Sequence, residues 1–213
     1  LNMNQIKKLK GLEGLNFFDK GTLSQFFDLS ENSLNTNIKR WLKAGILIQL
    51  KKGLYVTSEY VKTQRNRDVY LESVANKLRE PSYLSLEYVL QKNNILTEGV
   101  YGFTSVTLKS KRIYQNPFGV FVYRNIKRPL FDGYTIDEVD RFRIRTATKA
   151  KALFDYLYYK FFRIPEIRPE TIEDLRLNLA DVSRQEWKEF SEYCRTAGAR
   201  KMMGLTTLLK KSL

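Results

Sequence analysis

The sequence predicts an α+β fold, with a small N-terminal part of helices and a hairpin, then a larger mixed α/β part that ends in helices. Before residue 62, apolar residues recur at helical spacing and then alternate over two short runs. After Pro81, helix-period stretches are interleaved with strand-like runs of large residues. With 213 residues, 43% of them hydrophobic, the chain is long enough for two cores. We therefore expect two domains, residues 1–65 and residues 66–213.

The first part is predicted to contain three helices and a hairpin. We expect helices at Gln5–Leu12, Thr22–Phe27 and Asn32–Ala44, and strands at Ile46–Leu50 and Leu54–Val56. Gly45 stands where a helix C′ glycine belongs, which ends the third helix. The turn Lys51-Lys52-Gly53 joins the two strands, because glycine permits a tight hairpin. The polar segment Lys62–Asp68 is either a linker or the start of a helix that reaches Leu78.

The second part is predicted to alternate helices with strands. We expect a helix at Ser82–Asn93, strands at Tyr101–Leu108, Gly119–Arg124 and Phe142–Thr146, a charged break at Lys109–Arg112 and an irregular β region at Leu130–Ile136. The clearest helix is Thr148–Phe162, whose apolar residues recur at i, i+3, i+4, i+7 and i+11 from Ala150. Further helices are expected from Pro169 onwards.

Composition limits the chemistry that this chain can perform. Lys and Arg total 37 against 23 Asp and Glu, which gives a net charge of +14. This excess favours a polyanionic partner or a phosphate site, although a basic soluble protein without such a partner has the same composition. With no histidine and one cysteine, Cys194, the chain has no Ser-His-Asp or Cys-His centre, no histidine-ligated zinc and no intrachain disulfide. We expect no cofactor and no metal.

The sequence also bears on location. No run of about 18 apolar residues occurs, and the first residues lack the apolar core of a signal peptide. We therefore expect no membrane partner. A single cysteine fits a reducing, cytoplasmic location.

The third predicted helix has two different sides. On a wheel at about 100° per residue, Leu34, Ile38, Trp41 and Leu42 share the side that would face a core. The other side and its flanks carry hydroxyl, amide and cationic groups, on Ser33, Thr36, Asn37, Lys39, Arg40 and Lys43. Such groups read base edges and phosphates in a major groove, and the helix lengths and the turn have helix-turn-helix proportions. With Lys51 and Lys52 at a hairpin tip to meet the DNA backbone or the minor groove, the segment is predicted to be a winged helix-turn-helix that binds double-stranded DNA.

Two other interpretations of this segment stay open. Winged helices also serve as protein-interaction modules that make no DNA contact. A Lys-Lys-Gly turn also occurs simply as a soluble hairpin tip.

Four stretches of the second part carry a resemblance to a known family. They are PSYLSLEYVLQKNNILTEG (Pro81–Gly99), YGFTSVTLKSKR (Tyr101–Arg112), GVFVYRNIKRPLFDGY (Gly119–Tyr134) and RTATKAKALFDYLYYK (Arg145–Lys160). Their order and spacing resemble the AbiEi family of antitoxins from bacterial type IV toxin–antitoxin systems. That family has a winged helix, then a Y-x-S helix start, a strand, a G-x-F-x-Y strand with a following F-x-G-Y, and an A-x-x-x-K-A-L-x-D-x-L helix. This chain departs from the pattern in the fourth stretch, which reads TATKAKALFDYL where the family often has Pro-Glu before the lysine.

The resemblance implies a function in two parts. The winged helix would bind inverted repeats in the promoter of its own operon and repress it. Residues 66–213 would form an antitoxin domain that counteracts a nucleotidyltransferase-like toxin without a stable complex. A rival interpretation keeps the winged-helix regulator and makes the C-terminal domain a ligand-sensing or dimerisation domain.

Basic residues of the second part form a candidate antitoxin surface. Lys109, Lys111, Arg112, Arg124, Lys127 and Arg128 are interleaved with Tyr114, Phe121 and Tyr123, while Lys149, Lys151 and Lys160 share a predicted helix with Tyr156, Tyr158 and Tyr159. Cations beside aromatic rings suit RNA, nucleotides or phosphates. Ordinary strand faces and a core helix with snorkelling lysines would produce the same residues.

An enzyme is the third possibility for the second part. Asp132, Asp137, Glu138 and Asp140 stand close together in the sequence, and paired carboxylates hold Mg²⁺ in nucleases and nucleotidyltransferases. However, the stretch FDGYTIDEVDRF has no lysine at the strand position that a metal nuclease uses. The cluster also fits a polar turn. We therefore expect no catalytic residues.

Overall fold

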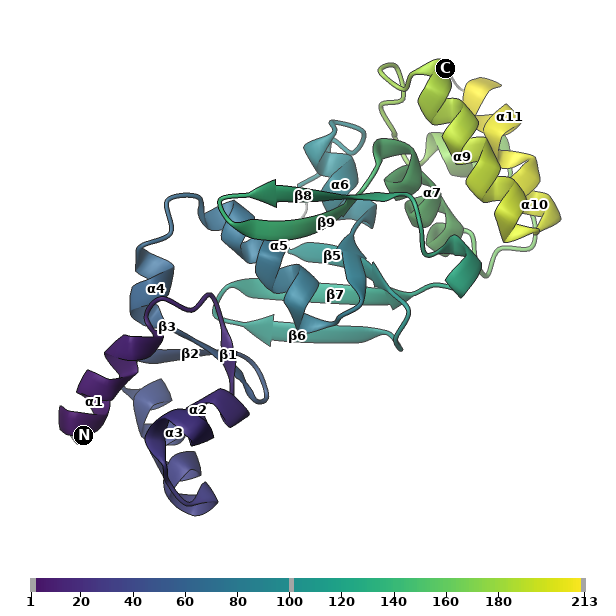
Figure 1. The fold of residues 1–213 in the computed structure, drawn as a ribbon. Coiled ribbons are helices and arrows are strands. Elements are labelled where there is room, and N and C mark those ends of the chain that lie inside the picture. The colour runs from purple at the N-terminus through teal and green to yellow at the C-terminus, as the bar shows by residue number, and fades with distance from the viewer. Residues whose placement is uncertain (1–2, 100–101, 212–213) are drawn as a thin grey trace. The chain divides into compact units, whose positions relative to one another are not determined.

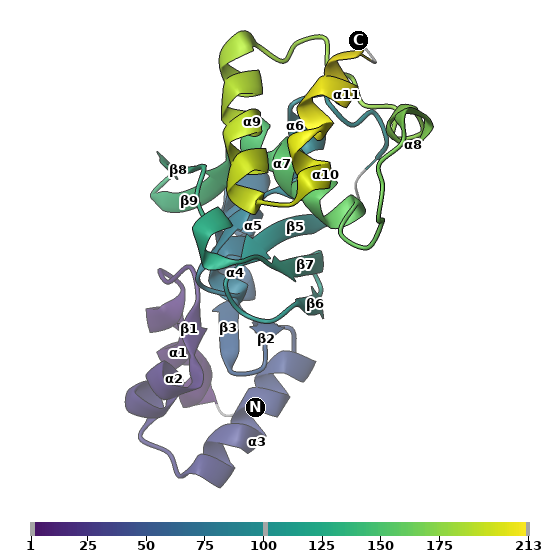
Figure 2. The ribbon, with the colours of Figure 1, turned by 90° about the vertical axis from the view of Figure 1, so that its right-hand side faces the viewer.

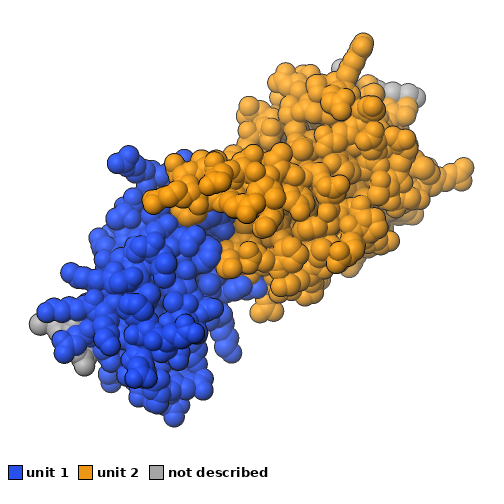
Figure 3. All heavy atoms as spheres, viewed as in Figure 1, with its two compact units in different colours: residues 1–74, 114–118 blue, residues 75–113, 119–213 orange. Residues whose placement is uncertain are grey.

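The computed structural model describes residues 3–99 and 102–211. The chain forms two compact units (Figure 3). Unit 1 comprises residues 1–74 and 114–118, and unit 2 comprises residues 75–113 and 119–213. The sequence placed a boundary after residue 65, whereas the two units divide between Val74 and Ala75, inside a helix.

Unit 1 contains short helices and a small sheet (Figure 1). Its elements are α1 (Met3–Leu9), the 3-10 turn η1 (Lys10–Leu12), β1 (Phe18–Asp19), α2 (Lys20–Phe27), α3 (Glu31–Lys43), β2 (Leu47–Lys51), β3 (Leu54–Thr57) and α4 (Ser58–Lys62), and α5 (Arg67–Leu78) begins in it. The strands are antiparallel in the order β1-β3-β2. The three expected helices and the hairpin are confirmed, while β1 and α4 were not predicted.

Local signals in the sequence set the ends of α2 and α3. Asp19 caps α2, because its Oδ1 accepts a hydrogen bond of 2.7 Å from the Thr22 amide. Ser30 caps α3 in the same way through the Ser33 amide. Gly45 has the left-handed φ of +67° expected of a C′ residue, which ends α3.

The core of unit 1 holds α3 in place. It is formed by the buried residues Leu9, Leu12, Phe18, Leu23, Phe27, Leu34, Ile38, Trp41, Leu47 and Tyr55. The rings of Phe27 and Trp41 lie 4.9 Å apart, which packs α2 on α3. Leu34, Ile38 and Trp41 are buried and Leu42 packs against them, so the predicted apolar side of α3 is confirmed.

Unit 2 is built on a mixed six-stranded sheet, although residues 114–116, at the end of an edge strand of this sheet, belong to unit 1. Its elements are β4 (Ser82–Leu84), α6 (Leu86–Lys92), β5 (Phe103–Thr107), β6 (Arg112–Asn116), β7 (Gly119–Asn125), the 3-10 turn η2 (Arg128–Leu130), β8 (Tyr134–Val139), β9 (Phe142–Ala147), α7 (Lys149–Lys160), α8 (Pro169–Glu173), α9 (Arg184–Ala197), α10 (Arg200–Met203) and α11 (Leu205–Lys211). The strand order is β6-β7-β5-β4-β9-β8, with β4–β5 and β8–β9 antiparallel and β4–β9 and β5–β7 parallel.

The two faces of this sheet meet different helices. Residues that pair across neighbouring strands point to the same face of the sheet, and by this pairing Tyr83 and Tyr123 point to opposite faces. On the Tyr83 face lies α7, because the Tyr83 hydroxyl donates a hydrogen bond to Asp155 of that helix. On the other face, the Tyr123 hydroxyl donates to the Ala75 carbonyl at the end of α5. The sheet is therefore covered on both sides.

The C-terminal helices pack on α7. α9 lies against α7, and α10 and α11 lie against α9 (Figure 2). Ser183 and Glu186 form a capping box at the start of α9. Cys194 is buried in α9, and burial raises the pKa of its thiol to about 12, so this cysteine is an unreactive core side chain.

Three predictions for unit 2 were wrong in detail. The expected helix at Ser82–Asn93 begins as the strand β4, because a short, fully buried run has no periodicity that separates a strand from a helix. The charged break is confirmed for residues 109–111, but Arg112 already belongs to β6, a half-exposed strand that was not predicted. The region from residue 130 to residue 136 is the end of η2 followed by the regular strand β8. Residue 101, the expected start of a strand, lies outside the described residues.

Among the described residues, no helix has the length and apolar character needed to cross a membrane.

Candidate nucleic-acid interface and the buried network of unit 2

The polar face of α3 points away from the core of unit 1. We use this name for Ser33, Thr36, Asn37, Lys39, Arg40 and Lys43, all of which are exposed except the half-buried Asn37. The exposed side lies opposite the buried Leu34, Ile38 and Trp41. The structure therefore brings the six predicted residues together on one accessible side of a single helix.

The groups on this face differ in whether they already form hydrogen bonds or ion pairs within the chain. The Ser33 hydroxyl accepts a hydrogen bond from Ser30, and the Thr36 hydroxyl donates to the Asn32 carbonyl, both at 2.9 Å. By contrast, Lys39, Arg40 and Lys43 form no ion pair within the described part of the chain. The three cations are the groups on this face that are best placed to take phosphates or base edges.

The two lysines at the hairpin tip have different surroundings. Lys52 is exposed, whereas Lys51 is half-buried with its Nζ 5.9 Å from the centre of the Tyr114 ring. Tyr114 belongs to residues 114–118, which are part of unit 1, and in that segment the Asn116 side chain donates a hydrogen bond of 3.0 Å to the Leu50 carbonyl. Lys52 is therefore the more available of the two, and the Tyr114 ring lies beside the hairpin of unit 1.

The candidate antitoxin residues do not form one surface. Lys109, Lys111, Arg112 and Arg124 are exposed, but the Lys149 Nζ lies 3.1 Å from a carboxylate oxygen of Glu186 and also donates to the Asp181 carbonyl. Phe121 and Tyr123 are buried and offer no ring to a partner. Lys151 is completely buried, so its assignment to a surface was wrong.

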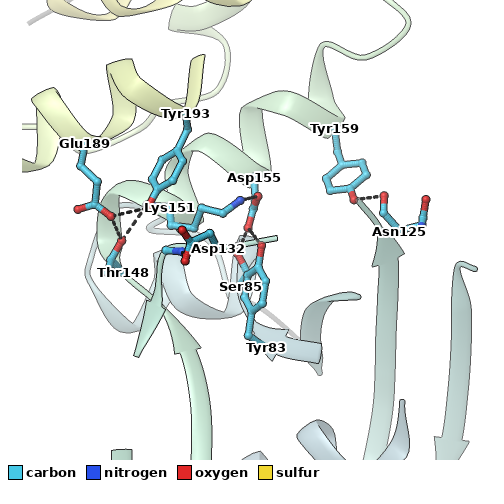
Figure 4. A network of polar contacts seen from close by, with 11 residues as sticks. Tyr83, Ser85, Asn125, Asp132, Thr148, Lys151, Asp155, Tyr159, Glu189 and Tyr193 are labelled. Atoms are coloured by element: carbon cyan, nitrogen blue, oxygen red, sulfur yellow. Dashed lines mark hydrogen bonds and ion pairs between the residues drawn. The ribbon is translucent and has the colours of Figure 1, made fainter. Parts of the chain in front are cut away.

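Lys151 instead pairs with Asp155 inside unit 2 (Figure 4). Both side chains have no exposed area. The Lys151 ammonium contacts one carboxylate oxygen of Asp155, while the hydroxyls of Tyr83 and Ser85 donate to the other at 3.0 and 2.8 Å. Every charged group of this pair is therefore hydrogen-bonded, which is the condition for burying charges in a core.

The surroundings of the pair are aromatic. The Lys151 Nζ lies 4.8 Å from the centre of the Phe154 ring, 5.2 Å from Tyr193 and 5.6 Å from Tyr83. Burial lowers the pKa of Lys151 and raises the pKa of Asp155, and in each case the partner's charge opposes the effect of burial. Burial and the neighbouring Asp155 raise the pKa of Tyr83 far above its ordinary value, so its phenol stays protonated and donates.

A second branch of the network joins α7 to α9. Glu189 Oε1 accepts hydrogen bonds from Thr148 at 2.6 Å and from Tyr193 at 2.8 Å (Figure 4). The Tyr193 hydroxyl also lies directly against Gly133: a Cβ atom added to Gly133 would lie only 2.0 Å from the hydroxyl oxygen. Gly133 has a φ of +74°, so both its backbone conformation and its surroundings require glycine.

The sequence motifs behind the resemblance meet in this network. Tyr83 and Ser85 come from Y-x-S, Gly133 from F-x-G-Y, and Lys151 and Asp155 from the K-A-L-x-D helix. The other aromatic residues of F-x-G-Y also pack on Tyr83, whose ring lies 4.9 Å from Tyr134 and 5.1 Å from Phe131. In this chain these residues build one buried centre that ties β4, the start of β8 and α7 together. The sequence did not predict that these motifs converge.

The acidic residues considered for catalysis lie apart from this network or at its edge. Asp132, Asp137, Glu138 and Asp140 are all exposed, and Asp140 has a φ of +49° in the turn between β8 and β9. Within residues 3–99 and 102–211, no three His, Cys, Asp or Glu side chains are grouped so that they could hold a metal ion. The cluster has the geometry of a polar hairpin turn.

Comparison with known proteins adds no family to this description. No protein-family model and no curated protein sequence matches the chain.

Proposed function

We propose that the chain is a DNA-binding transcriptional regulator, with unit 1 as a winged helix-turn-helix domain. α2 and α3 would be the helix-turn-helix, α3 the recognition helix, and the hairpin of β2 and β3 the wing. One observation carries this proposal: α3 has one side buried in the core of unit 1 and presents Lys39, Arg40 and Lys43 on the other, none of them in an ion pair with any residue that the structure describes. The exposed Lys52 follows on the next hairpin.

Substitutions on α3 and on the wing should affect DNA binding differently. Arg40→Ala should lower affinity for the chain's own promoter by about 1–3 kcal/mol and leave affinity for random DNA nearly unchanged, because a bidentate base contact discriminates by that amount. Lys52→Ala should weaken both complexes about equally and reduce the salt dependence of binding by about one released counterion, because it contacts phosphate. Fluorescence anisotropy with promoter and random duplexes at several salt concentrations measures both effects.

Lys62→Ala is the matched control, since Lys62 is an exposed cation of unit 1 that is already paired with Glu59 at 3.1 Å. It should leave both affinities unchanged. Equal losses on promoter and random DNA for both Arg40→Ala and Lys52→Ala would remove the assigned roles. Absence of binding to any duplex by the unaltered chain would favour a protein-interaction module.

We further propose autorepression of its own operon and an antitoxin role for the C-terminal domain, against a nucleotidyltransferase-like toxin and without a stable complex. This part rests on the resemblance to the AbiEi family. The structure supports the resemblance indirectly, because residues from three of the quoted motifs pack into one buried centre. These residues are Tyr83, Ser85, Gly133, Lys151 and Asp155.

A growth experiment tests the antitoxin role separately from DNA binding. The reading frame next to this gene is induced in a bacterial host, with the full chain or with an Arg40→Ala/Lys52→Ala double variant expressed beside it. Point variants are preferable to truncation, because α5 spans the division between the units. Both chains should restore growth. A harmless neighbour, or rescue by the unaltered chain alone, would favour the regulator with a ligand-sensing or dimerisation domain.

A further inference from the structure

Unit 2 contains a pocket that neither DNA binding nor the buried network explains. Its volume is about 680 Å³, within the range of roughly 300–1,000 Å³ that is usual for small-molecule sites. It lies where the end of β7 and the turn between β5 and β6 meet the C-terminal end of α7. We call it the basic pocket.

Five exposed cations line the basic pocket, namely Lys111, Arg124, Lys127, Lys160 and Arg163. The described lining contains no acidic residue, and within the described part of the chain none of the five forms an ion pair with a carboxylate. A concave site lined by charges of one sign attracts ligands of the opposite sign. The pocket therefore suits a ligand that carries several negative charges.

Aromatic rings stand beside these cations. Tyr158 and Tyr159 line the pocket with Phe162, whose side chain is 60% exposed. The rings of Tyr158 and Phe162 lie 5.9 Å apart at the end of α7. A large ring left in water next to cations is the arrangement on which nucleobases stack.

The walls of the pocket are held in place by contacts within unit 2. The Tyr159 hydroxyl donates to the Asn125 carbonyl, and the Arg124 guanidinium lies 5.5 Å from the centre of the Tyr159 ring. The Asn125 side chain donates to the carbonyls of Leu108 and Lys109, each at 3.0 Å. The site is therefore formed in advance, which reduces the entropy cost of binding.

A helix C-terminus would ordinarily disfavour an anion, because its free carbonyls carry partial negative charge. In unit 2, Lys201 places a positive charge at this end of α7. Its Nζ donates to the carbonyls of Phe161, Phe162 and Ile164 at 2.8, 3.0 and 2.7 Å. The carbonyls at and just after the end of α7 are thus occupied by a cation.

We infer that the basic pocket binds a free nucleotide, with its phosphates on the cations and its base on Phe162 and Tyr158. This goes beyond the proposed regulator and does not depend on it. The described lining offers no carboxylate to hold Mg²⁺, so the protein's own cations neutralise the phosphates. Binding should therefore need no metal and should be tighter for metal-free ATP than for Mg-ATP.

Calorimetry on the full chain tests the inference with ATP, adenosine and tripolyphosphate, each in excess EDTA. ATP should bind more tightly than either fragment. Phe162→Ala should weaken ATP binding by roughly 5- to 150-fold, the effect of losing one base-stacking ring, and should leave tripolyphosphate unaffected. Lys127→Ala/Arg163→Ala should weaken both ligands by about tenfold or more, because two charges are lost.

Two matched controls separate the pocket from general surface effects. Ile113→Ala removes an apolar side chain of similar exposure, 65%, and Arg184→Ala/Lys188→Ala removes two exposed cations of α9; both should bind ATP normally. The inference is overturned if ATP does not bind, if tripolyphosphate binds as tightly as ATP, or if Phe162→Ala matches the unaltered chain. If ATP does not bind but a single-stranded RNA decamer does, and Lys127→Ala/Arg163→Ala weakens the RNA complex, the inference is overturned and the pocket is assigned to RNA.

Discussion

Lys151→Met is expected to destabilise unit 2 by about 3–5 kcal/mol, because it leaves the Asp155 carboxylate in the core without its counter-charge. Tyr83 and Ser85 would still donate to Asp155, but two neutral donors do not replace an ammonium. Loss of one partner of a buried pair is far more costly than loss of an exposed one. This lysine should therefore behave as part of the core rather than as part of a binding surface.

The decrease in the free energy of unfolding that Lys151→Met causes should also depend on pH. Burial raises the pKa of Asp155, and Lys151 opposes that effect. Without the lysine, the folded state should hold the carboxyl protonated at higher pH than the unfolded state does. A folded-state pKa above the unfolded value, about 3.9, stabilises the fold at low pH, and this contribution is lost as pH rises. The deficit should therefore be smaller at pH 5 than at pH 8.

Denaturant unfolding can report on unit 2 by itself. The chain has two tryptophans, Trp41 in unit 1 and Trp187 in unit 2, so a Trp41→Phe background leaves Trp187 as the reporter. Lys149→Met is the control, since Lys149 is the half-buried lysine of an ion pair on the same helix and should cost at most about 1 kcal/mol. A double variant, Lys151→Met/Asp155→Leu, should be more stable than Lys151→Met alone. Equal costs for Lys151→Met and Lys149→Met would contradict a structural role for the buried pair.

The contrast between Lys151 and the polar face of α3 shows what a sequence can predict. The side of α3 that faces the core was predictable, because helical periodicity within 13 residues separates Leu34, Ile38 and Trp41 from the polar positions. The spacing of Lys151 and Asp155, i and i+4, was equally visible. Their burial was not, because the residues that complete the site, Tyr83 and Ser85, lie 72 and 70 positions away from Asp155.

Strand errors have a related cause. All three residues of β4 are buried, so the strand shows no alternation, and only its pairing with β5 and β9 defines it. The segment from Tyr114 to Phe118 was assigned to the second part of the chain by its position in the sequence. The contact of Tyr114 with Lys51 and that of Asn116 with Leu50 place it in unit 1 instead. Long-range contacts of this kind leave no local signal.

Gly133→Ala should be the second severely destabilising substitution, with a cost of about 2–5 kcal/mol. About 1–2 kcal/mol comes from placing a Cβ on a residue in the left-handed conformation, and overpacking adds about 1–3 kcal/mol. The new Cβ would lie 2.0 Å from the Tyr193 hydroxyl and 2.6 Å from its ring carbon. Tyr193 would have to give up its hydrogen bond to Glu189 within α9 and shift its ring, which lies 5.6 Å from that of Phe154 in α7.

Gly198→Ala isolates the steric part of this cost. Gly198 also lies in unit 2 and has a φ of +70° against +74° for Gly133, but nothing lies within 4 Å of the position where its Cβ would stand. Its substitution should therefore cost only the backbone term of about 1–2 kcal/mol. In a Tyr193→Phe background, the cost of Gly133→Ala should fall, because the atom in closest conflict is gone. If Gly133→Ala and Gly198→Ala cost the same in Trp187-monitored unfolding, Tyr193 does not close over Gly133, and the F-x-G-Y motif needs another explanation.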